Sequence, residues 1–162
     1  MLVRRLRLAD LGLAVWVAIV AIATQAAAQE RFSGQWDIAG AVVAPWASDP
    51  KDASDEADAN RLVGQMARIG PGVFRAPRPL GCANPTFVLR NTTADMLFEG
   101  SLSADGAGKP TDPIVVARAL GITTKTMRGM TANCSEVEFV LVDPNKIMFG
   151  LNNRVFTMKR AK

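Results

Sequence analysis

The chain has 162 residues, a formal net charge of +4, two cysteines, and neither histidine nor tyrosine. The missing histidine excludes Ser-His and Cys-His nucleophiles, histidine-based zinc sites and the usual acid-base group near neutral pH. The positive charge comes without a basic tract or an aromatic stacking motif, so nucleic acid is not expected as a partner.

Residues 1–28 have the pattern of a cleaved secretion signal. Three arginines precede the uncharged run Leu11–Thr24, and three alanines at 26–28 supply the small residues that a signal peptidase accepts. The run is shorter than the ~20 residues of a membrane span; the alternatives are an uncleaved anchor or a buried helix. We expect cleavage before Gln29 and one mature domain, 29–162, in the periplasm or outside the cell, with no stable membrane span.

The first part of the mature chain predicts a strand followed by an acidic stretch. Residues Trp36–Ala44 alternate with period two and include β-branched residues, which is typical of a strand. Residues 47–60 are acidic and predict a solvated loop or a short exposed helix. Asp52, Asp55 and Asp58 have a spacing that suggests calcium, but the glycine and the terminal glutamate of a calcium loop are missing.

The middle of the chain predicts short extended stretches and one helix. The extended stretches are Arg61–Ile69 and Val73–Ala76, on either side of the turn Gly70-Pro71-Gly72, and then Thr86–Arg90 and Met96–Glu99. Asp112-Pro113 is typical of a helix start, and Gly121 of the end of a helix over Ile114–Leu120.

The C-terminal third predicts a meander of three strands. These are Val137–Val142, Ile147–Leu151 and Arg154–Lys159, joined by the turn residues Asp143–Lys146 and Asn152-Asn153. Short strands at this spacing indicate a mainly β fold, a small antiparallel barrel or sandwich with one short helix.

Cys82 and Cys134 predict one disulfide. An even pair of cysteines in an oxidising compartment is typical of a bridge, and a loop of this size would contribute about 4 kcal/mol in the chain-entropy picture. The alternative is two separate buried thiols.

Residues 61–90 contain five arginines and no acidic residue. Arg68, Arg75 and Arg78 flank the glycine-proline turn closely enough to converge, and the planar guanidinium pairs well with carboxylate or phosphate. These three arginines are therefore the candidate ligand-binding or partner-binding residues. The alternative is a solvated face that offsets the acidic stretch 47–60.

Other side chains give weaker signals. Glu136 and Glu138 could form a carboxylate pair of the glycosidase type, but their alternation along a strand favours a solvated face. Five methionines could line a pocket, but core packing is the better interpretation; they are Met66, Met127, Met130, Met148 and Met158. We expect no enzyme activity, no cofactor and no metal site.

Ser33-Gly34-Gln35-Trp36 resembles the G-x-W first strand of lipocalin-like (calycin) barrels. It also resembles the S-G-x-W start of the small secreted barrel inhibitors of serralysin-type metalloproteases. By this resemblance Trp36 would plug the closed end of a barrel, and the residue pattern gives it the role of a core anchor. The T-D-Y stretch of lipocalins is absent, and the inhibitors have their disulfide at a shorter spacing.

The sequence predicts a monomeric, non-catalytic binding protein that captures a small or amphipathic ligand in a barrel mouth. One alternative is an inhibitor of an extracytoplasmic hydrolase of the protease or lysozyme class, and another is a structural envelope protein. The partner would be a small-molecule ligand or an envelope protein. A solvent-open apolar pocket would favour capture, and a filled barrel with a protruding segment Gln29–Phe32 would favour inhibition.

Overall fold

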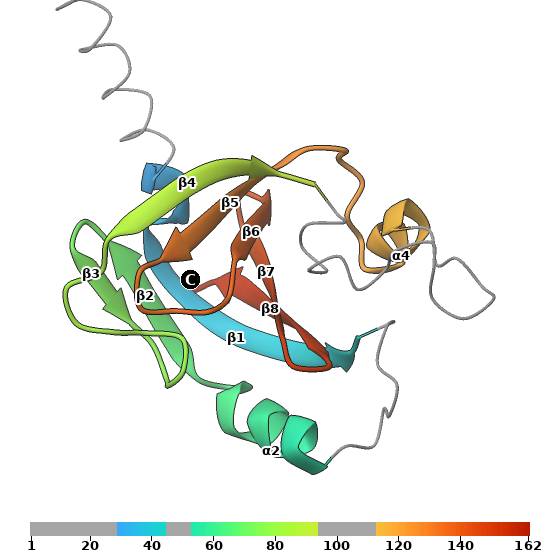
Figure 1. Ribbon diagram of the computed structural model, residues 1–162, viewed down its shortest axis with the longest axis horizontal. Helices are drawn as coiled ribbons and strands as arrows, with labels where there is room; N and C mark the ends of the chain where they lie inside the picture. Colours follow the sequence, from blue (N-terminus) through green and yellow to red (C-terminus); the bar gives the residue numbers. More distant parts are fainter. Residues whose placement is uncertain (1–28, 45–52, 94–112) are drawn as a thin grey trace, which may run out of the picture.

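The computed structural model describes residues 29–44, 53–93 and 113–162 (Figure 1). The predicted signal and the predicted strand Met96–Glu99 lie outside these residues. Within them the strands are β1 (Gly34–Val43), β2 (Met66–Gly70), β3 (Val73–Arg75), β4 (Phe87–Thr92), β5 (Met127–Ala132), β6 (Phe139–Asp143), β7 (Lys146–Leu151) and β8 (Arg154–Arg160). The helices are α2 (Ala53–Leu62) and α4 (Pro113–Ala119), and residues 29–32 form a further helical turn.

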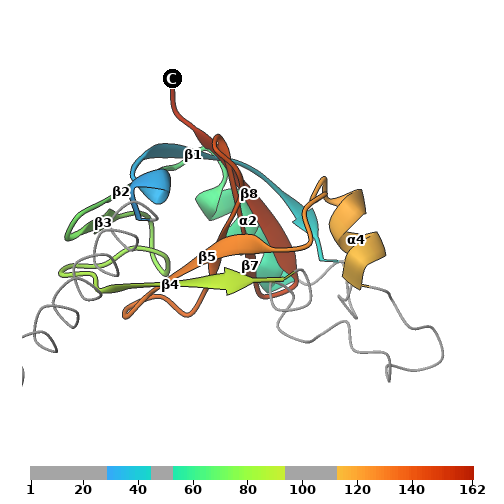
Figure 2. The same ribbon diagram turned by 90° about the horizontal axis from the view of Figure 1, so that it is seen from above.

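All eight strands form one antiparallel sheet in the order β3-β2-β1-β8-β7-β6-β5-β4. Strands that follow each other along the chain are neighbours, except that β3 and β4 are the two edges and β1 pairs with β8. The sheet curls so that β1 and β4 lie on opposite sides of a shared interior (Figure 2). This arrangement is a curled half-barrel, compatible with a lipocalin-like fold, and it confirms the mainly β antiparallel prediction.

At the seam between the edge strands β3 and β4, a backbone bridge holds Cys82 against β3 and the disulfide links Cys82 to the end of β5. Phe74 of β3 pairs with Cys82 in an isolated antiparallel bridge. Cys82 is bonded to Cys134, which follows β5; their Cα atoms are 6.1 Å apart and 52 positions separate them. The predicted disulfide is confirmed, and it ties the β3 side of the seam to the β4–β5 side.

The concave side of the sheet is filled by aromatic rings. Phe74 contacts Phe139 edge-on with centroids 5.3 Å apart, Phe139 contacts Phe149 at 5.2 Å, and Phe149 stacks on Phe156 at 5.0 Å. All four are at most 1% exposed. Such pairs add to the large apolar area that each ring buries. The interior of the half-barrel is therefore a packed core.

A smaller apolar cluster covers the convex side. Val116 and Ala117 of α4 belong to a buried cluster with Val140, Met148 and Val155, which alternate with the inward-facing residues of β6, β7 and β8. Figures 1 and 2 both show α4 outside the curl. These central strands thus have apolar residues on both faces, which explains their near-continuous hydrophobic sequences.

Helix α2 confirms one of the two structures that were expected for the acidic stretch, a short exposed helix. α2 is a short exposed helix that ends at Leu62, so β2 begins at Met66 and not at Arg61. Glu56 of α2 forms an ion pair of 2.6 Å with Arg154. The charged side chains of α2 contact β8 and solvent, so this helix needs few apolar residues.

Two expectations differ from the structure. Four of the five methionines are buried as predicted, but Met66 is 58% exposed, because it occupies an outward position at the start of β2. β5 was not predicted, because Gly129 and Arg128 interrupt its apolar pattern. No helix among the described residues is long and apolar enough to cross a membrane.

Candidate functional site

The structure brings together two of the three predicted arginines directly. Arg68 of β2 and Arg75 of β3 are cross-strand partners on the convex face, and both are exposed. Like charges directly opposite each other in a sheet are destabilising. Among the described residues, neither arginine is in an ion pair with a carboxylate.

Arg78 lies on the loop between β3 and Cys82 and is exposed. It lines, with Arg75, a hollow of about 580 Å³ whose far wall is formed by residues 81–84. Its carbonyl oxygen accepts a hydrogen bond from Arg61. Arg68, Arg75 and Arg78 are called the arginine surface below.

The other two arginines of this stretch have acidic partners. Arg61 pairs with Asp58 at 2.5 Å. Arg90 donates two hydrogen bonds to Glu138, of 2.8 and 2.6 Å, which pass over Gly129 of β5. The hydrogen bond to Glu138, and then its charge, raise the pKa of Arg90 above the ordinary value. The pair Glu136 and Glu138 is therefore not poised for joint acid-base work, because Glu138 is held by Arg90.

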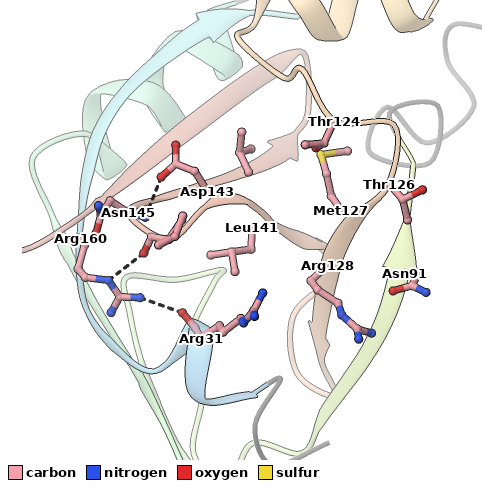
Figure 3. A pocket seen from close by; sticks show the side chains of 12 residues that line it. Arg31, Asn91, Thr124, Thr126, Met127, Arg128, Leu141, Asp143, Asn145 and Arg160 are labelled. Atoms are coloured by element: carbon pink, nitrogen blue, oxygen red, sulfur yellow. Dashed lines mark hydrogen bonds between the residues drawn. The ribbon is translucent and has the colours of Figure 1, made fainter. Parts of the chain in front are cut away.

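The end of the half-barrel at which β1 begins contains a hollow of about 660 Å³ (Figure 3). We call it the end pocket. It is lined by residues from five stretches of the chain: Arg31, Asn91, Thr124, Thr126, Met127, Arg128, Leu141, Val142, Asp143, Pro144, Asn145 and Arg160. Its lining combines apolar side chains on β5 and β6 with charged and amide groups at the rim.

Strand register explains why polar side chains reach the concave face here. Arg128 is the cross-strand partner of both Asn91 and Leu141. Leu141 belongs to the concave core, and so does Met130, two residues after Arg128. Because alternate residues of a strand share a face, Arg128 and Asn91 point to the same side as the core. They lie at the mouth and are exposed.

Arg160 lines this pocket and packs on the buried ring of Trp36. Trp36 is fully buried, its Nε1 donates a 2.8 Å hydrogen bond to the carbonyl of Phe32, and Arg160 stands over its ring with Cζ 4.3 Å from the centroid. A guanidinium at this distance from an indole makes a favourable cation–π contact. Arg160 also donates to the carbonyl oxygens of Pro144 at 3.0 Å, and of Ser33 and Arg31, both at 2.8 Å.

Local sequence patterns do not predict the end pocket, because its charged residues belong to elements that such patterns do not connect. Arg31 precedes the first strand, Arg128 lies on the unpredicted β5, and Arg160 follows the last predicted strand. One sequence feature that could have indicated the pocket is Arg128, a charged residue two positions before the apolar Met130. Asp52, one of the three aspartates whose spacing suggests calcium, lies outside the described residues. Within the described ranges no group of three His, Cys, Asp or Glu residues could hold a metal ion.

No family profile, no characterised protein and no solved structure is significantly similar to this chain. The likeness to lipocalin-like barrels therefore depends on Ser33–Trp36 and on the curled antiparallel sheet itself.

Proposed function

We propose that this chain is a non-catalytic, lipocalin-like binding protein of the periplasm or cell exterior that captures a small amphipathic ligand in the end pocket. The observation that carries the proposal is the pocket's composition and size. Leu141 offers an apolar surface on the concave side, polar groups surround it, and about 660 Å³ lies within the ~300–1,000 Å³ typical of small-molecule sites.

The ligand is placed at the end of the half-barrel because the interior has no room. Phe139, Phe149 and Phe156 fill the space that a deep ligand would need. The bound molecule would rest against the side of Leu141 that faces the mouth. The proposed ligand is thus captured in the mouth, and it lies less deep than a ligand in an open barrel.

Binding without catalysis is the simplest use of these side chains. The chain has no histidine, and both cysteines form the disulfide. Asp143, the carboxylate of the pocket lining, accepts a 2.8 Å hydrogen bond from the backbone of Asn145 within its own turn. A reacting pair of acid and base would need a second titratable group beside it.

Capture can be tested with a blocked pocket. The mature protein is incubated with an envelope extract, re-isolated and analysed for bound small molecules by mass spectrometry, beside Thr126→Trp and Thr123→Trp. Thr126 lines the pocket, whereas Thr123 is exposed in the same segment and does not. We expect Thr126→Trp to lose the ligand and Thr123→Trp to retain it. Equal ligand content in all three proteins, or none in any, would contradict capture in this pocket.

A second candidate function is inhibition of an extracytoplasmic hydrolase, with docking at the arginine surface. The observation in its favour is the unopposed pair Arg68 and Arg75, whose repulsion a docked acidic group would relieve. The segment Gln29–Phe32 is a less suitable inhibitory arm, because it is a helical turn whose Phe32 is fully buried.

Charge reversal tests this second candidate. Arg75→Glu with Arg78→Glu should weaken capture of an envelope protein while the melting temperature stays nearly unchanged, since both side chains are exposed. Binding should also weaken as salt rises. Arg118→Glu on α4 is the control. A partner that binds the double variant as tightly as the native protein would identify the arginine surface as a solvated face.

A further inference from the structure

The charged groups of the end pocket are not equivalent. Arg160 uses its guanidinium on three backbone carbonyls and on the ring of Trp36. Asp143 is bonded to the backbone of its own turn. Arg31 and Arg128 differ, because within the described residues neither is in an ion pair. Arg61, Arg90 and Arg154 show that arginines elsewhere in this structure do find carboxylates.

The guanidinium groups of Arg31 and Arg128 line the same end pocket. In Figure 3 the side chain of Arg31 reaches across the opening from the helical turn, and that of Arg128 enters from β5 beside Asn91. Leu141, the cross-strand partner of Arg128, also lines this pocket. Bringing two positive charges to one mouth costs free energy, and an anion between them would remove that cost.

We propose that Arg31 and Arg128 bind the anionic head group of the ligand, a carboxylate or a phosphate ester, whose alkyl part lies against Leu141 on the concave side of β6. This inference rests on the proposed capture function and specifies its ligand class. Guanidinium groups form strong, directional hydrogen bonds with both anions. The amide of Asn91 supplies a further donor at the same rim.

Arg160 is a positioning residue in this arrangement. Its hydrogen bonds to the carbonyls of Arg31 and Ser33 join the helical turn to the end of β8. Because a flexible segment would lose entropy on binding, a turn held in place in advance lowers the cost of using Arg31 as a ligand contact.

Four probes separate the head group from the alkyl chain: decanoate, decyl phosphate, decanol and inorganic phosphate. Binding to the mature protein is measured by titration calorimetry. We expect decanoate, decyl phosphate or both to bind at least about tenfold more tightly than decanol. Inorganic phosphate should bind more weakly than either decyl anion, since it lacks the apolar part. The ratio of the two anions then distinguishes a carboxylate from a phosphate ester as the natural head group.

Variants connect the effect to the two arginines. Arg31→Gln and Arg128→Gln should each weaken binding of the decyl anions about tenfold or more and leave decanol unchanged, with Arg118→Gln as an exposed control. Arg31→Lys and Arg128→Lys keep the charge without the fork and should show intermediate losses. Thermal melts verify that every variant is folded.

The outcomes distinguish the two proposals. Decanol binding as tightly as decanoate, or unchanged anion affinity in both Gln variants, would overturn the anionic head group and leave ligand capture intact, provided that Thr126→Trp still blocks uptake. If none of the decyl compounds binds and Thr126→Trp captures from extract what the native protein captures, both proposals are wrong.

Discussion

At the scale of single residues, Trp36 is the side chain on which most of the closed end depends. Its ring is fully buried, its indole nitrogen is bonded to Phe32, and Arg160 packs over one face. The sequence made Trp36 a candidate core anchor from alternation and from the likeness to lipocalins. It did not predict Arg160, because a cation above an indole depends on the pairing of β1 with β8 and not on any local pattern.

Trp36→Ala should lower the free energy of unfolding by about 3–5 kcal/mol, because it leaves a large cavity in a packed core. Trp36→Phe retains most of the packing and loses the hydrogen bond to Phe32, so about 1 kcal/mol is expected. Met66→Ala, at an exposed apolar position, should change stability by less than about 0.5 kcal/mol. Urea denaturation measures all three. A stable Trp36→Ala protein that no longer captures ligand would make Trp36 a binding residue.

The charge partners of the arginines depend on the pairing of distant strands. The run without acidic residues made Arg68 and Arg75 candidates, and the strand register makes them cross-strand partners. It could not separate them from Arg90, whose partner Glu138 is distant in sequence. Charge compensation between strands is a tertiary property, so a local charge count identifies candidates without showing which of them have partners.

At the scale of elements, the seam between β3 and β4 is the unusual part of the sheet. Every other pair of strands that are neighbours along the chain is joined by a ladder. Here Phe74 of β3 forms one bridge with Cys82, which precedes β4, and the disulfide joins Cys82 to Cys134 after β5. The bridge requires a close approach at Gly81. A Cβ atom there would overlap the backbone nitrogen of Ala76 and lie 2.8 Å from the carbonyl oxygens of Ala76 and Phe74.

Gly81→Ala should therefore destabilise the protein by about 1–3 kcal/mol, because backbone atoms must move to admit the methyl group. Gly70→Ala, in the neighbouring hairpin, is the matched control: no atom lies within 4 Å of its added Cβ. It should be within about 0.5 kcal/mol of the native protein. Thermal or urea unfolding under non-reducing conditions makes the comparison. Equal free energies of unfolding for Gly81→Ala and Gly70→Ala would show that the backbone around Gly81 moves to admit the methyl group at no cost in stability.

The elements themselves were predictable to the extent that each carries its own pattern. The strands β6, β7 and β8 follow from apolar runs and turn residues, and α4 from its proline start and glycine end. β5 was missed because Gly129 is required for space under the Arg90–Glu138 pair, and a glycine weakens a strand pattern. The need for that glycine is visible only when three strands are side by side.

At the scale of the whole molecule, the N-terminal turn closes the half-barrel at the end pocket. Phe32 is fully buried in the main core. The carbonyls of Arg31, Phe32 and Ser33 accept hydrogen bonds from Arg160 or Trp36. The curled β architecture and the disulfide followed from composition and spacing. The pocket did not, because it is assembled from segments at both ends of the chain and in its middle.

If the predicted signal 1–28 is cleaved, this closure makes the position of the cleavage important for the fold. Cleavage before Gln29 leaves the whole helical turn 29–32 in the mature protein, whereas cleavage a few residues later would remove Phe32 and Arg31. The exported protein should therefore begin at Gln29, as the preceding alanines predict. Intact-mass measurement of the exported protein tests this. A full-length membrane-bound species, or a mature chain that begins after Phe32, would contradict it.

A protein expressed without residues 29–32 then shows what the turn contributes. Loss of the buried Phe32 ring should lower the free energy of unfolding by about 3–5 kcal/mol. Arg160 would lose its carbonyl acceptor on Arg31, and the end pocket would lose the Arg31 side chain. Removal of Lys162 alone, at the exposed other terminus, is the control and should change little. Urea denaturation measures the stability, and decanoate titration measures the pocket. A shortened protein of native stability and native affinity would place the turn outside both the core and the binding site.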